Sequence, residues 1–504
     1  MMEDDREDNS APDKRRKIDE YGYRRITSSP HSQQRDVYHI IIDKNQTDCT
    51  DEDQVFSSWL CQPCWASQVA RHRQWDCDGN EIGTTNLLRA EIRSLSRQLV
   101  QVKRRLFPAA EQCVDASSSE PEYGVYELTA RQEFNQARSR CNPFEILGER
   151  RGLGRLFLNR AAVKLANIDA LINFELTTPT IPTQLDHDYG RQYPFVFVDL
   201  CGAPGGFSEY IIRRCQNEGI GPVFGYGMSL IGSNEHGDAT PWKLNSSAYL
   251  ENPCLRQYRI CEGKTGTGDV FVWENVEHLI NLMQNDCIHQ GNYGVHNNEN
   301  NDANGSEGYG QRMDTEQSKA HLVVVDGGFD AQRDCEDQEA IAQKLIVCEA
   351  AAALACLRRG GTLVMKMFGF QTDVVRAVVA DLQSRYFEDM IVLKPISSRP
   401  ASAERYLVGR GFRGLESDWD GPTWKSSMFL GESFGQSRLA TDYFDTFDRD
   451  LLQLNLKSCF AILTHLENRH AAKSSEYHDW NAGSEGFSSF TITPRAYKHA
   501  WRLC

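Results

Sequence analysis

The feature that most constrains the fold of this chain is a continuous apolar run that ends in a glycine-rich turn. The run Phe195–Leu200 reads FVFVDL, and residues 201–206 that follow it read CGAPGG. A strand that is apolar on both faces is typical of a parallel sheet covered by helices on its two sides. A helical pattern over residues 209–215 comes directly after the turn. The sequence therefore predicts a strand–turn–helix unit of an α/β sheet.

Strand-like and helical segments alternate along the rest of this region. An Ala-rich helix is expected over residues 340–357, before the pair Gly360-Gly361. Further strands are expected over residues 222–228, 321–326, 361–368, 390–394 and 405–408. This alternation predicts a mostly parallel, doubly wound sheet with flanking helices, of the Rossmann-like α/β class. Such sheets bind ligands beyond the carboxyl ends of their strands, so the site is sought there.

Composition divides the chain into four regions. Residues 1–55 are acidic and polar and are expected to form a disordered tail. Residues 56–130 are expected to be a helical region of unknown role, residues 131–412 the α/β domain, and residues 413–504 a C-terminal extension. Within the α/β domain, about residues 289–320 are rich in Asn, Gly, Asp and Glu, which predicts a low-complexity insertion between two core elements.

The overall charge and hydropathy limit the kind of partner. The formal net charge is −15, which argues against a chain that binds polyanions over its whole surface but leaves room for a local basic patch. No apolar stretch reaches the roughly 18 to 20 residues of a membrane span, and the N-terminus lacks the apolar segment of a secretory signal. The protein is therefore expected inside the cell, without a membrane partner. The cluster Lys14-Arg15-Arg16-Lys17 fits a nuclear import signal and a solvated charge run equally well.

One helical pattern stands out in the N-terminal region. Its apolar residues recur at steps of four and three and share one face: Leu88, Ile92, Leu95, Leu99, Val102 and Leu106. Cationic residues crowd the remaining surface: Arg89, Arg93, Arg97, Lys103, Arg104 and Arg105. The pattern suits a coiled-coil or partner-binding helix, and it suits packing against the main domain as well.

The cysteines indicate free thiols. All sixteen are scattered between Cys49 and Cys504, and a chain of this length does not need disulfide staples. Cys61 and Cys64 form a CxxC pair that His72 and Cys77 would complete as a zinc site, but no second CxxC follows at the spacing of a zinc finger. No bound metal is therefore expected.

Four charged residues occupy or adjoin the predicted strand ends. They are Lys164 in an amphipathic helical segment, Asp326 at the end of HLVVVD, Lys366 inside LVMKMF, and Glu404 before the last strand. A lysine in a buried strand needs either a carboxylate partner or a lowered pKa. A structural ion pair is one interpretation. Convergence of all four side chains would instead allow one amine, held near neutrality, to accept a proton while the others fix the geometry.

The glycine-rich turn narrows the choice of cofactor. It is not GxGxxG followed by the acidic residue that dinucleotide binding requires, and it lacks the final Lys-Ser/Thr of a P-loop. Its small residues allow the backbone to approach a bound molecule closely. A tight turn kept only for its geometry is the alternative interpretation.

Several segments, in order along the chain, resemble one family. DLCGAPGGFSEY, VVVDGGF, LVMKMF and SSRPASAERY together are similar to the FtsJ-like ribose 2′-O-methyltransferases. LFLNRAAVKLANID and ARSRCNPFE resemble the cap-specific mRNA 2′-O-methyltransferase 1 subfamily within it. The resemblance covers about residues 138–411. It implies a Rossmann-like methyltransferase fold over residues 131–412, dependent on S-adenosyl-L-methionine, that methylates a ribose 2′-hydroxyl of RNA.

The resemblance also implies a role for each matching residue. The catalytic tetrad is expected to be Lys164, Asp326, Lys366 and Glu404, with Lys366 as the proton acceptor. The cofactor is expected to contact Asn159, Cys201, Gly202, Ala203, Pro204, Gly205, Gly206, Phe207, Asp269 and Val270. The RNA is expected to contact Arg138, Arg140 and Ser402, with the arginines on phosphates.

The substrate that the resemblance implies is mRNA with an N7-methylguanosine cap, methylated on its first transcribed nucleotide. It further implies action in the nucleus, with the transcription machinery as a partner. Three alternatives stay open: the second cap nucleotide, a ribose of ribosomal or transfer RNA, and a non-catalytic RNA-binding protein with the same fold.

Overall fold

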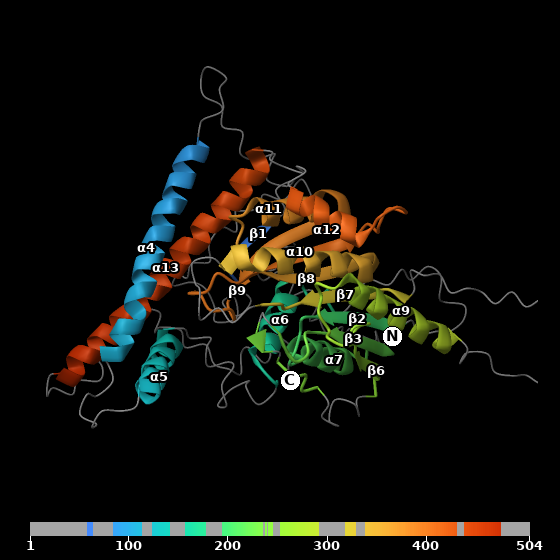
Figure 1. Cartoon of the computed structure of the whole chain (residues 1–504), viewed down its shortest axis with the longest axis horizontal. Helices are drawn as coiled ribbons and strands as arrows, with labels where there is room; N and C mark the ends of the chain where they lie inside the picture. Colours follow the sequence, from blue (N-terminus) through green and yellow to red (C-terminus); the bar gives the residue numbers. More distant parts are fainter. Residues whose placement is uncertain are drawn as a thin grey trace, which may run out of the picture.

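The molecule is built around one large sheet flanked by helices (Figure 1). A computed structural model describes residues 58–63, 84–112, 123–141, 157–177, 194–234, 237–238, 240–244, 253–291, 318–328, 338–430 and 438–474. The strands are β1 Ser58–Pro63, β2 Phe195–Leu200, β3 Val223–Met228, β4 Ser233–Asn234, β5 Gly237–Asp238, β6 Leu255–Ile260, β7 Ala320–Val325, β8 Leu357–Met367, β9 Phe387–Pro395 and β10 Arg405–Phe412. The helices are α4 Thr84–Gln112, α5 Tyr123–Cys141, α6 Arg160–Leu171, α7 Gly206–Glu218, α9 Trp273–Gly291, α10 Gln338–Cys356, α11 Asp373–Asp381, the π-helical turn η6 Leu382–Tyr386, α12 Gly421–Leu430 and α13 Arg438–Ser474.

Eight strands form the sheet, in the order β1-β9-β10-β8-β7-β2-β3-β6. The run from β8 to β6 is parallel, and β10 pairs antiparallel with both β8 and β9. From β2 the chain moves to β3 on one side, whereas β7 and β8 follow on the other. Right-handed crossovers therefore place α7 and α10 on opposite faces of the sheet. The prediction of a mostly parallel, doubly wound sheet with flanking helices is confirmed.

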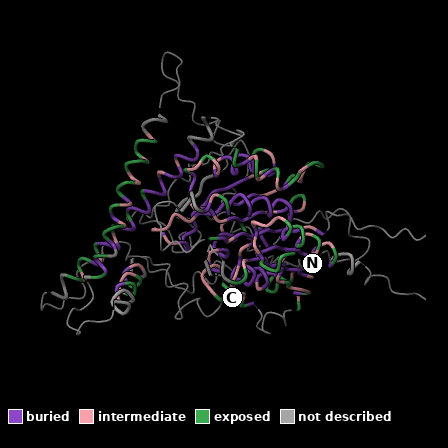
Figure 2. Tube along the Cα trace, viewed as in Figure 1, coloured by how far each residue is buried: buried purple, intermediate pink, exposed green. Residues whose placement is uncertain are grey.

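The centre of the sheet is fully buried, as continuous apolar strands require (Figure 2). Every residue of β2, β3 and β7 is buried. On one face, α10 presents the small side chains Ala350, Ala351, Ala352 and Ala353, none of which is exposed to solvent. These short side chains let the helix approach the strands closely.

Two strands of the large sheet escaped the sequence analysis, and both lie at its edges. β6 (LRQYRI) has one buried residue, Leu255, and its other residues are intermediate or exposed, so it lacks the continuous apolar run of the central strands. β1 (SWLCQP) lies in the region expected to be helical and pairs antiparallel with β9. That region is therefore not purely helical, and its second helix, α5, runs past residue 130 to Cys141.

Three helices form a second, smaller core beside the sheet, and we call α4, α5 and α13 the helical annex. Their shared core contains Leu99, Val102, Leu106, Leu452, Leu456, Ile462, Leu463 and Leu466. Figure 1 shows α4 and α13 lying side by side along much of their length. Of the two roles left open for the amphipathic helix, the structure supports packing within the chain, and the partner is α13 rather than the sheet.

Buried ion pairs fasten the annex to the sheet. Arg405, the first residue of β10, pairs with Asp448 of α13, and their side chains are only 4% and 1% exposed. The Arg405 guanidinium also lies 4.7 Å from the ring centre of Phe370 and 5.2 Å from that of Phe447. Arg376 of α11 pairs with Asp445 one turn earlier in α13.

Some features expected from the sequence lie partly or wholly outside the described residues. No described helix combines the length and apolar character that crossing a membrane requires. The cysteines whose side chains are described are free thiols, and no three described His, Cys, Asp or Glu residues are grouped as metal ligands would be. Cys64, His72 and Cys77, the basic cluster at residues 14–17, and most of the insertion at about 289–320 lie outside the described residues.

The Arg405–Asp448 pair yields a stability prediction. Asp448→Ala leaves a buried guanidinium without its carboxylate, so we expect the free energy of unfolding to fall by about 3 kcal/mol. Urea denaturation measures this change. As a control on the same helix, Gln453→Ala replaces an exposed side chain and should change stability by less than about 0.5 kcal/mol. Equal stability of Asp448→Ala and the control would show that the pair does not fasten the annex.

Candidate functional site

The candidate site lies at the carboxyl edge of the sheet, where the chain turns in opposite directions. β2 leads to Cys201 and neighbouring β7 leads to Asp326, whose backbone N–H donates to the Leu200 carbonyl oxygen at 3.3 Å. Helices α7 and α10 leave from this point toward opposite faces. A switch point of this kind opens a crevice between adjacent strand ends, which is where doubly wound sheets bind ligands.

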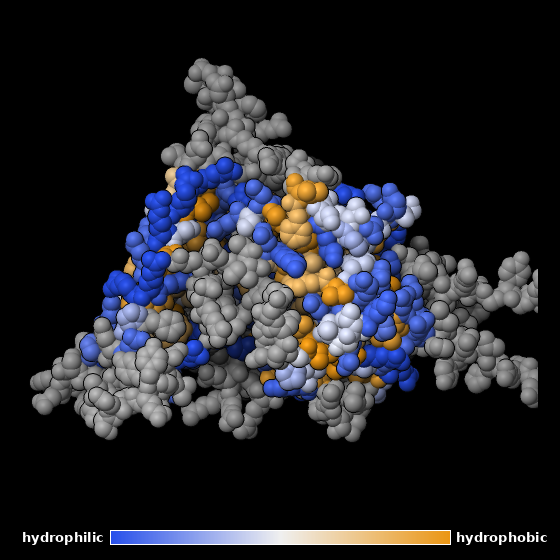
Figure 3. Space-filling model, in the orientation of Figure 1, coloured by the Kyte–Doolittle hydropathy of each residue, from blue (hydrophilic) through white to orange (hydrophobic). Residues whose placement is uncertain are grey.

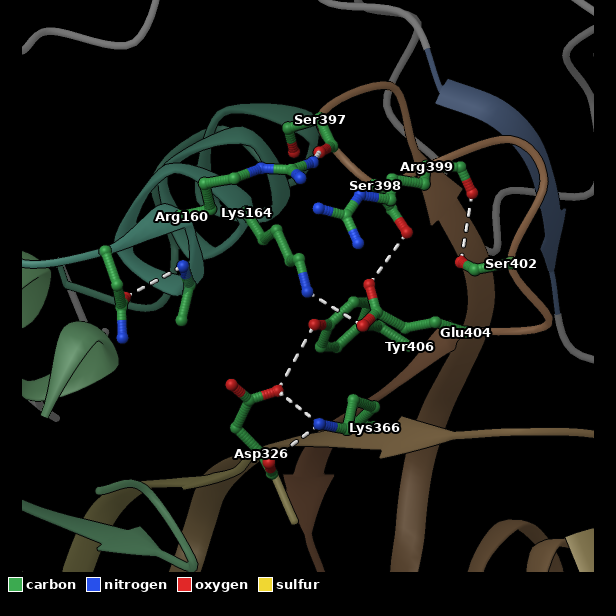
Figure 4. A network of polar contacts seen from close by, with 12 residues as sticks. Arg160, Lys164, Asp326, Lys366, Ser397, Ser398, Arg399, Ser402, Glu404 and Tyr406 are labelled. Carbon is green, nitrogen blue, oxygen red and sulfur yellow. Dashed lines mark hydrogen bonds and ion pairs between the residues drawn. The ribbon is translucent and has the colours of Figure 1, made fainter. Parts of the chain in front are cut away.

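The four charged residues predicted from the sequence meet at this edge as two ion pairs (Figure 4). Lys366 Nζ lies 3.0 Å from Asp326 Oδ1 and donates to the Asp326 carbonyl oxygen at 2.8 Å. Lys164 Nζ lies 2.7 Å from Glu404 Oε2. The four side chains are between 11% and 17% exposed, so they are largely desolvated yet can still be reached by a ligand. Convergence of the predicted tetrad is therefore observed.

Tyr406 links the two pairs and was not predicted. Antiparallel pairing of β10 with β8 places Tyr406 directly opposite Lys366. Its hydroxyl donates to Asp326 Oδ1 at 3.4 Å, and Figure 4 shows the ring between Asp326 and Glu404. Ser398 holds the other oxygen of Glu404 through a 2.7 Å hydrogen bond. Each of the four charged side chains is therefore held by its ion pair, and Asp326 and Glu404 are each held by a further hydrogen bond.

Burial and the neighbouring carboxylates have opposite effects on the pKa of Lys366. Burial lowers the pKa of Lys366, but the carboxylates of Asp326 and Glu404 outweigh burial, and the pKa is raised above its ordinary value. Burial would raise the pKa of Glu404, but Lys164, Lys366 and Lys394 together hold it well below its usual range. Lys366 therefore fits the alternative in which a buried lysine has a carboxylate partner, rather than the one in which its pKa is lowered.

A third lysine, missed by the sequence analysis, supports the loop of residues 397–405 from behind. Lys394 of β9 is completely buried, and burial holds its pKa well below the ordinary value. Its Nζ donates to the Ser402 carbonyl oxygen at 2.8 Å and to Ser402 Oγ at 2.9 Å, and it also donates to the Glu404 carbonyl oxygen. Asn455 of α13 donates to the same Ser402 carbonyl at 3.0 Å. The position of Glu404 therefore depends on both β9 and the annex.

Ser402 itself is engaged within the protein. Its hydroxyl donates to the Arg399 carbonyl oxygen at 3.0 Å and accepts from Lys394. These bonds give Ser402 a positioning role in the 397–405 loop. Its predicted contact with RNA stays a prediction.

The glycine-rich turn is shaped by a buried carboxylate beneath it. Asp199 Oδ2 accepts from the backbone N–H of Ser208 at 3.1 Å and from its hydroxyl at 2.6 Å, while Oδ1 is buried without a partner among the described residues. A Cβ on Gly202 would lie 1.9 Å from that free oxygen, so only glycine fits there. Burial raises the pKa of Asp199 to about 7, although Ser208 donates to it.

The turn contains two residues with left-handed backbone, and the N-terminal cap of α6 contacts it. Cys201 adopts a φ of 54° and Gly205 a φ of 106°, both in the left-handed region. Asn159 Oδ1 caps α6 by accepting from the Ala161 N–H at 2.9 Å, and it would lie 2.0 Å from a Cβ on Gly206, so the cap touches the turn. The Phe207 side chain is buried, with its ring centre 6.3 Å from that of Tyr406.

The second predicted cofactor element, Asp269-Val270, lies on the loop after β6 at the same edge. Gly268 on this loop is packed so tightly that a Cβ would lie 2.0 Å from the carbonyl oxygen of Ser229, the residue after β3. Asp269 is partly exposed and its Oδ1 accepts from the Phe271 N–H at 2.9 Å, whereas Val270 is buried. A buried, unpartnered carboxylate oxygen, a turn with three glycines and a partly exposed carboxylate fit a cofactor that carries positive charge and hydrogen-bond donors.

A buried glutamate joins the two loops that border the crevice. Glu349 of α10 is 1% exposed; the Cys201 thiol donates to it, and a Cβ on Gly327 would lie 1.7 Å from its Oε1. Burial raises the pKa of Glu349 to about 8, although Cys201 and the charge of Lys366 oppose that rise. The sequence did carry a signal, since Glu349 is an isolated acid in the apolar run LIVCEAAAALA.

The two arginines predicted to contact RNA are not brought to the tetrad by the described contacts. Arg138 lies in α5, where its guanidinium stacks 5.5 Å from the Phe134 ring centre and donates to Asn135 at 2.7 Å. Arg140 belongs to the same helix, and its side chain lies outside the described residues. Two other arginines, Arg160 and Arg399, lie beside Lys164 instead (Figure 4).

Glu349 gives a pH prediction. Its pKa rises from 4.5 in the unfolded chain to about 8 in the fold, so the stability it contributes is present below about pH 4.5 and is lost as the pH rises toward 8. Glu349→Gln cannot ionise, so its free energy of unfolding should increase relative to the wild type across that window, by at most about 1.4 kcal/mol per pH unit. Urea denaturation at several pH values measures the difference. Glu277→Gln, at an exposed position on α9, is the control and should show no such trend.

Comparison with known proteins gives a consistent result for the α/β region. Residues 157–412 match the family described as FtsJ-like methyltransferase. The protein named cap-specific mRNA (nucleoside-2′-O-)-methyltransferase 1 of Drosophila melanogaster is 33% identical over 284 residues, which is 56% of this chain and 30% of that protein. The Homo sapiens protein of the same name is 30% identical over 293 residues, which is 57% of this chain and 30% of that protein. The chain thus matches less than a third of the length of these relatives.

A solved structure also shows similarity. It is described as a ribosomal RNA methyltransferase of Plasmodium falciparum, and the match is 16% identical, covers 51% of this chain and 99% of that chain, and has a TM-score of 0.29.

Proposed function

Because the chain belongs to the FtsJ-like methyltransferase family, we propose that it uses S-adenosyl-L-methionine to methylate a ribose 2′-hydroxyl of RNA. We further propose that the target is the first transcribed nucleotide of N7-methylguanosine-capped mRNA. The observation that carries the proposal is the meeting of two lysine–carboxylate pairs beside a glycine-rich turn at the switch point of the sheet. The cap specificity is supported by the names of the relatives, which the chain matches over part of their length.

S-adenosyl-L-methionine supplies an electrophilic methyl group on a positively charged sulfur. Residues 201–207 and the Asn159 cap would hold it on one side of the crevice, and Asp269 and Val270 on the other. The free oxygen of Asp199 under the turn adds an acceptor that favours positive charge. The fit of these groups to a cationic cofactor supports a binding role for the turn over the alternative of a turn kept only for its geometry.

In this proposal Lys366 accepts the proton of the ribose hydroxyl. Its amine is protonated when only Asp326 and Glu404 face it, and an added positive charge nearby lowers the pKa of an amine. Occupation of the turn would therefore favour the neutral amine just when a base is needed. Asp326 holds Nζ in place, and the Lys164–Glu404 pair fixes the opposite wall, so the hydroxyl can be aligned for an in-line displacement.

The approach of the RNA is supported by cations next to the tetrad. Arg160 and Arg399 lie beside Lys164 in Figure 4, and guanidinium groups bind phosphates in a bidentate manner. We propose that these two side chains contact the phosphates that flank the methylated ribose. Arg138 and Arg140 stay candidates for RNA farther from the reacting atoms.

The place of action and the further partners are also proposals. Nuclear location is supported by the basic cluster Lys14-Arg15-Arg16-Lys17 and by the resemblance to cap-modifying enzymes. The transcription machinery as a partner is supported by the resemblance alone.

Transfer of a labelled methyl group tests the activity. We expect label from S-adenosyl-L-methionine on RNA with an N7-methylguanosine cap, located by nuclease mapping on the ribose of the first nucleotide. Lys366→Ala removes the proton acceptor and should lower kcat by about 10²- to 10⁴-fold. Lys457→Ala, an exposed lysine of α13, is the matched control and should keep full activity.

Other outcomes would redirect the assignment. Label on the second nucleotide would contradict the first-nucleotide target, and equal label on uncapped RNA would contradict cap specificity. Unchanged methyl transfer by Lys366→Ala would exclude this residue as the base.

A further inference from the structure

The outer face of α4 carries a line of arginines that the proposed catalytic site does not use. Arg93, Arg97 and Arg104 are all exposed. At 100° per residue they fall within an arc of about 40° on the helix, opposite the buried face made by Leu99, Val102 and Leu106. The rise of about 1.5 Å per residue separates the first two by about 6 Å and the next by about 10 Å along the axis. We call these three residues the basic stripe.

The charge of the stripe contrasts with that of the chain. Residues 84–112 contain six Lys and Arg and two Glu, whereas the whole chain has a net charge of −15. Figure 3 shows strongly hydrophilic side chains along α4 on the outer flank of the molecule. A local cationic surface on an otherwise acidic protein is typical of a site for a polyanion.

Two members of the stripe are not used to hold the fold. Arg89 and Arg105, which flank the stripe, pair with Asp445 and Glu467 of α13. Arg93 and Arg97, in contrast, make no hydrogen bond or ion pair with any other residue that the structure describes. Their side chains are therefore available to a ligand from solution.

Contacts within the annex link α4 to the loop of residues 397–405. Asn455 of α13 donates to the Ser402 carbonyl at 3.0 Å, and Ala401 packs against the annex core. Two residues before Asn455 on the same helix, Gln453 donates to Glu91 of α4 at 3.2 Å. The part of α13 that contacts the loop therefore also contacts the part of α4 where the stripe begins. The helix that carries the stripe is therefore linked through α13 to the loop that precedes Glu404.

We infer that the basic stripe binds backbone phosphates of the substrate RNA at nucleotides downstream of the methylated one. This inference rests on the proposed function for the identity of the polyanion. RNA is favoured over an acidic protein segment because the guanidinium groups form a single line, which suits a linear series of phosphates, and because the annex adjoins the loop where the RNA would react. The contact is independent of sequence, since it reads only the backbone.

Binding of capped RNAs of about 4 and about 25 nucleotides tests the inference. The wild type should bind the longer RNA more tightly, and Arg93→Glu/Arg97→Glu should remove most of that advantage while leaving binding of the short RNA and its kcat unchanged. The slope of log affinity against log salt for the long RNA should become shallower by about one per arginine lost. Arg256→Glu, which reverses one exposed arginine on edge strand β6, is the control and should change neither quantity. Circular dichroism and thermal unfolding confirm that each variant is folded.

The outcomes separate this inference from the proposed function. If the double variant keeps the wild-type length advantage and salt slope, the stripe does not bind RNA. If it loses affinity for poly-glutamate but not for the long RNA, the stripe serves an acidic protein and the inference is overturned. If the wild type methylates no capped RNA but its affinity for the long RNA still depends on Arg93 and Arg97, the proposed function is contradicted, whereas binding of RNA by the stripe is supported.

Discussion

The ammonium group of Lys366 lies within an apolar strand, and its burial is tolerable only because the carboxylate of Asp326 is 3.0 Å away. This requirement fixes much of the arrangement around it. Asp326 can reach Lys366 because β7 ends next to β8, and Glu404 can approach because β10 begins on the other side of β8. The order β10-β8-β7 is thus the order that surrounds one buried charge with two carboxylates. Tyr406, opposite Lys366 on β10, fills the gap between them.

The features that the sequence predicted well are those with a strong local signal. β2 and its turn follow from a continuous apolar run and clustered small residues. Three members of the tetrad follow from charged residues in or next to predicted strands, and Lys164 follows from the amphipathic segment that forms α6. Lys394, in contrast, sits in a strand pattern like that of Lys366, and nothing local shows that it faces the back of a loop rather than the crevice. Asn455 is 53 residues from its partner Ser402, so only the folded chain reveals the contact. β6 was missed because it lacks a continuous apolar run, and β1 was missed because it lies in a region expected to be helical.

The annex shows why a C-terminal helix cannot be treated as an appendage. Asp445, Asp448 and Asn455 occur along one side of α13, and each meets a different part of the α/β domain: α11, the start of β10 and the 397–405 loop. Apolar contact accompanies the polar ones, since Phe370 and Phe444 have ring centres 5.0 Å apart. Glu404 is therefore located by two independent supports, Lys394 from the sheet and Asn455 from the annex.

The electrostatic balance of the site follows from which carboxyl groups are free to ionise. Asp326 and Glu404 each face a lysine, so the two pairs together carry no net charge. Asp199 and Glu349 lie just beneath, and burial raises their pKa values to about 7 and 8, well above the ordinary carboxyl range. A cation above them favours their ionised forms and lowers the pKa of Lys366 directly, whereas an ionised Glu349 raises the pKa of Lys366. The protonation of these buried groups is therefore coupled, so a positive ligand in the turn acts on all three of them together.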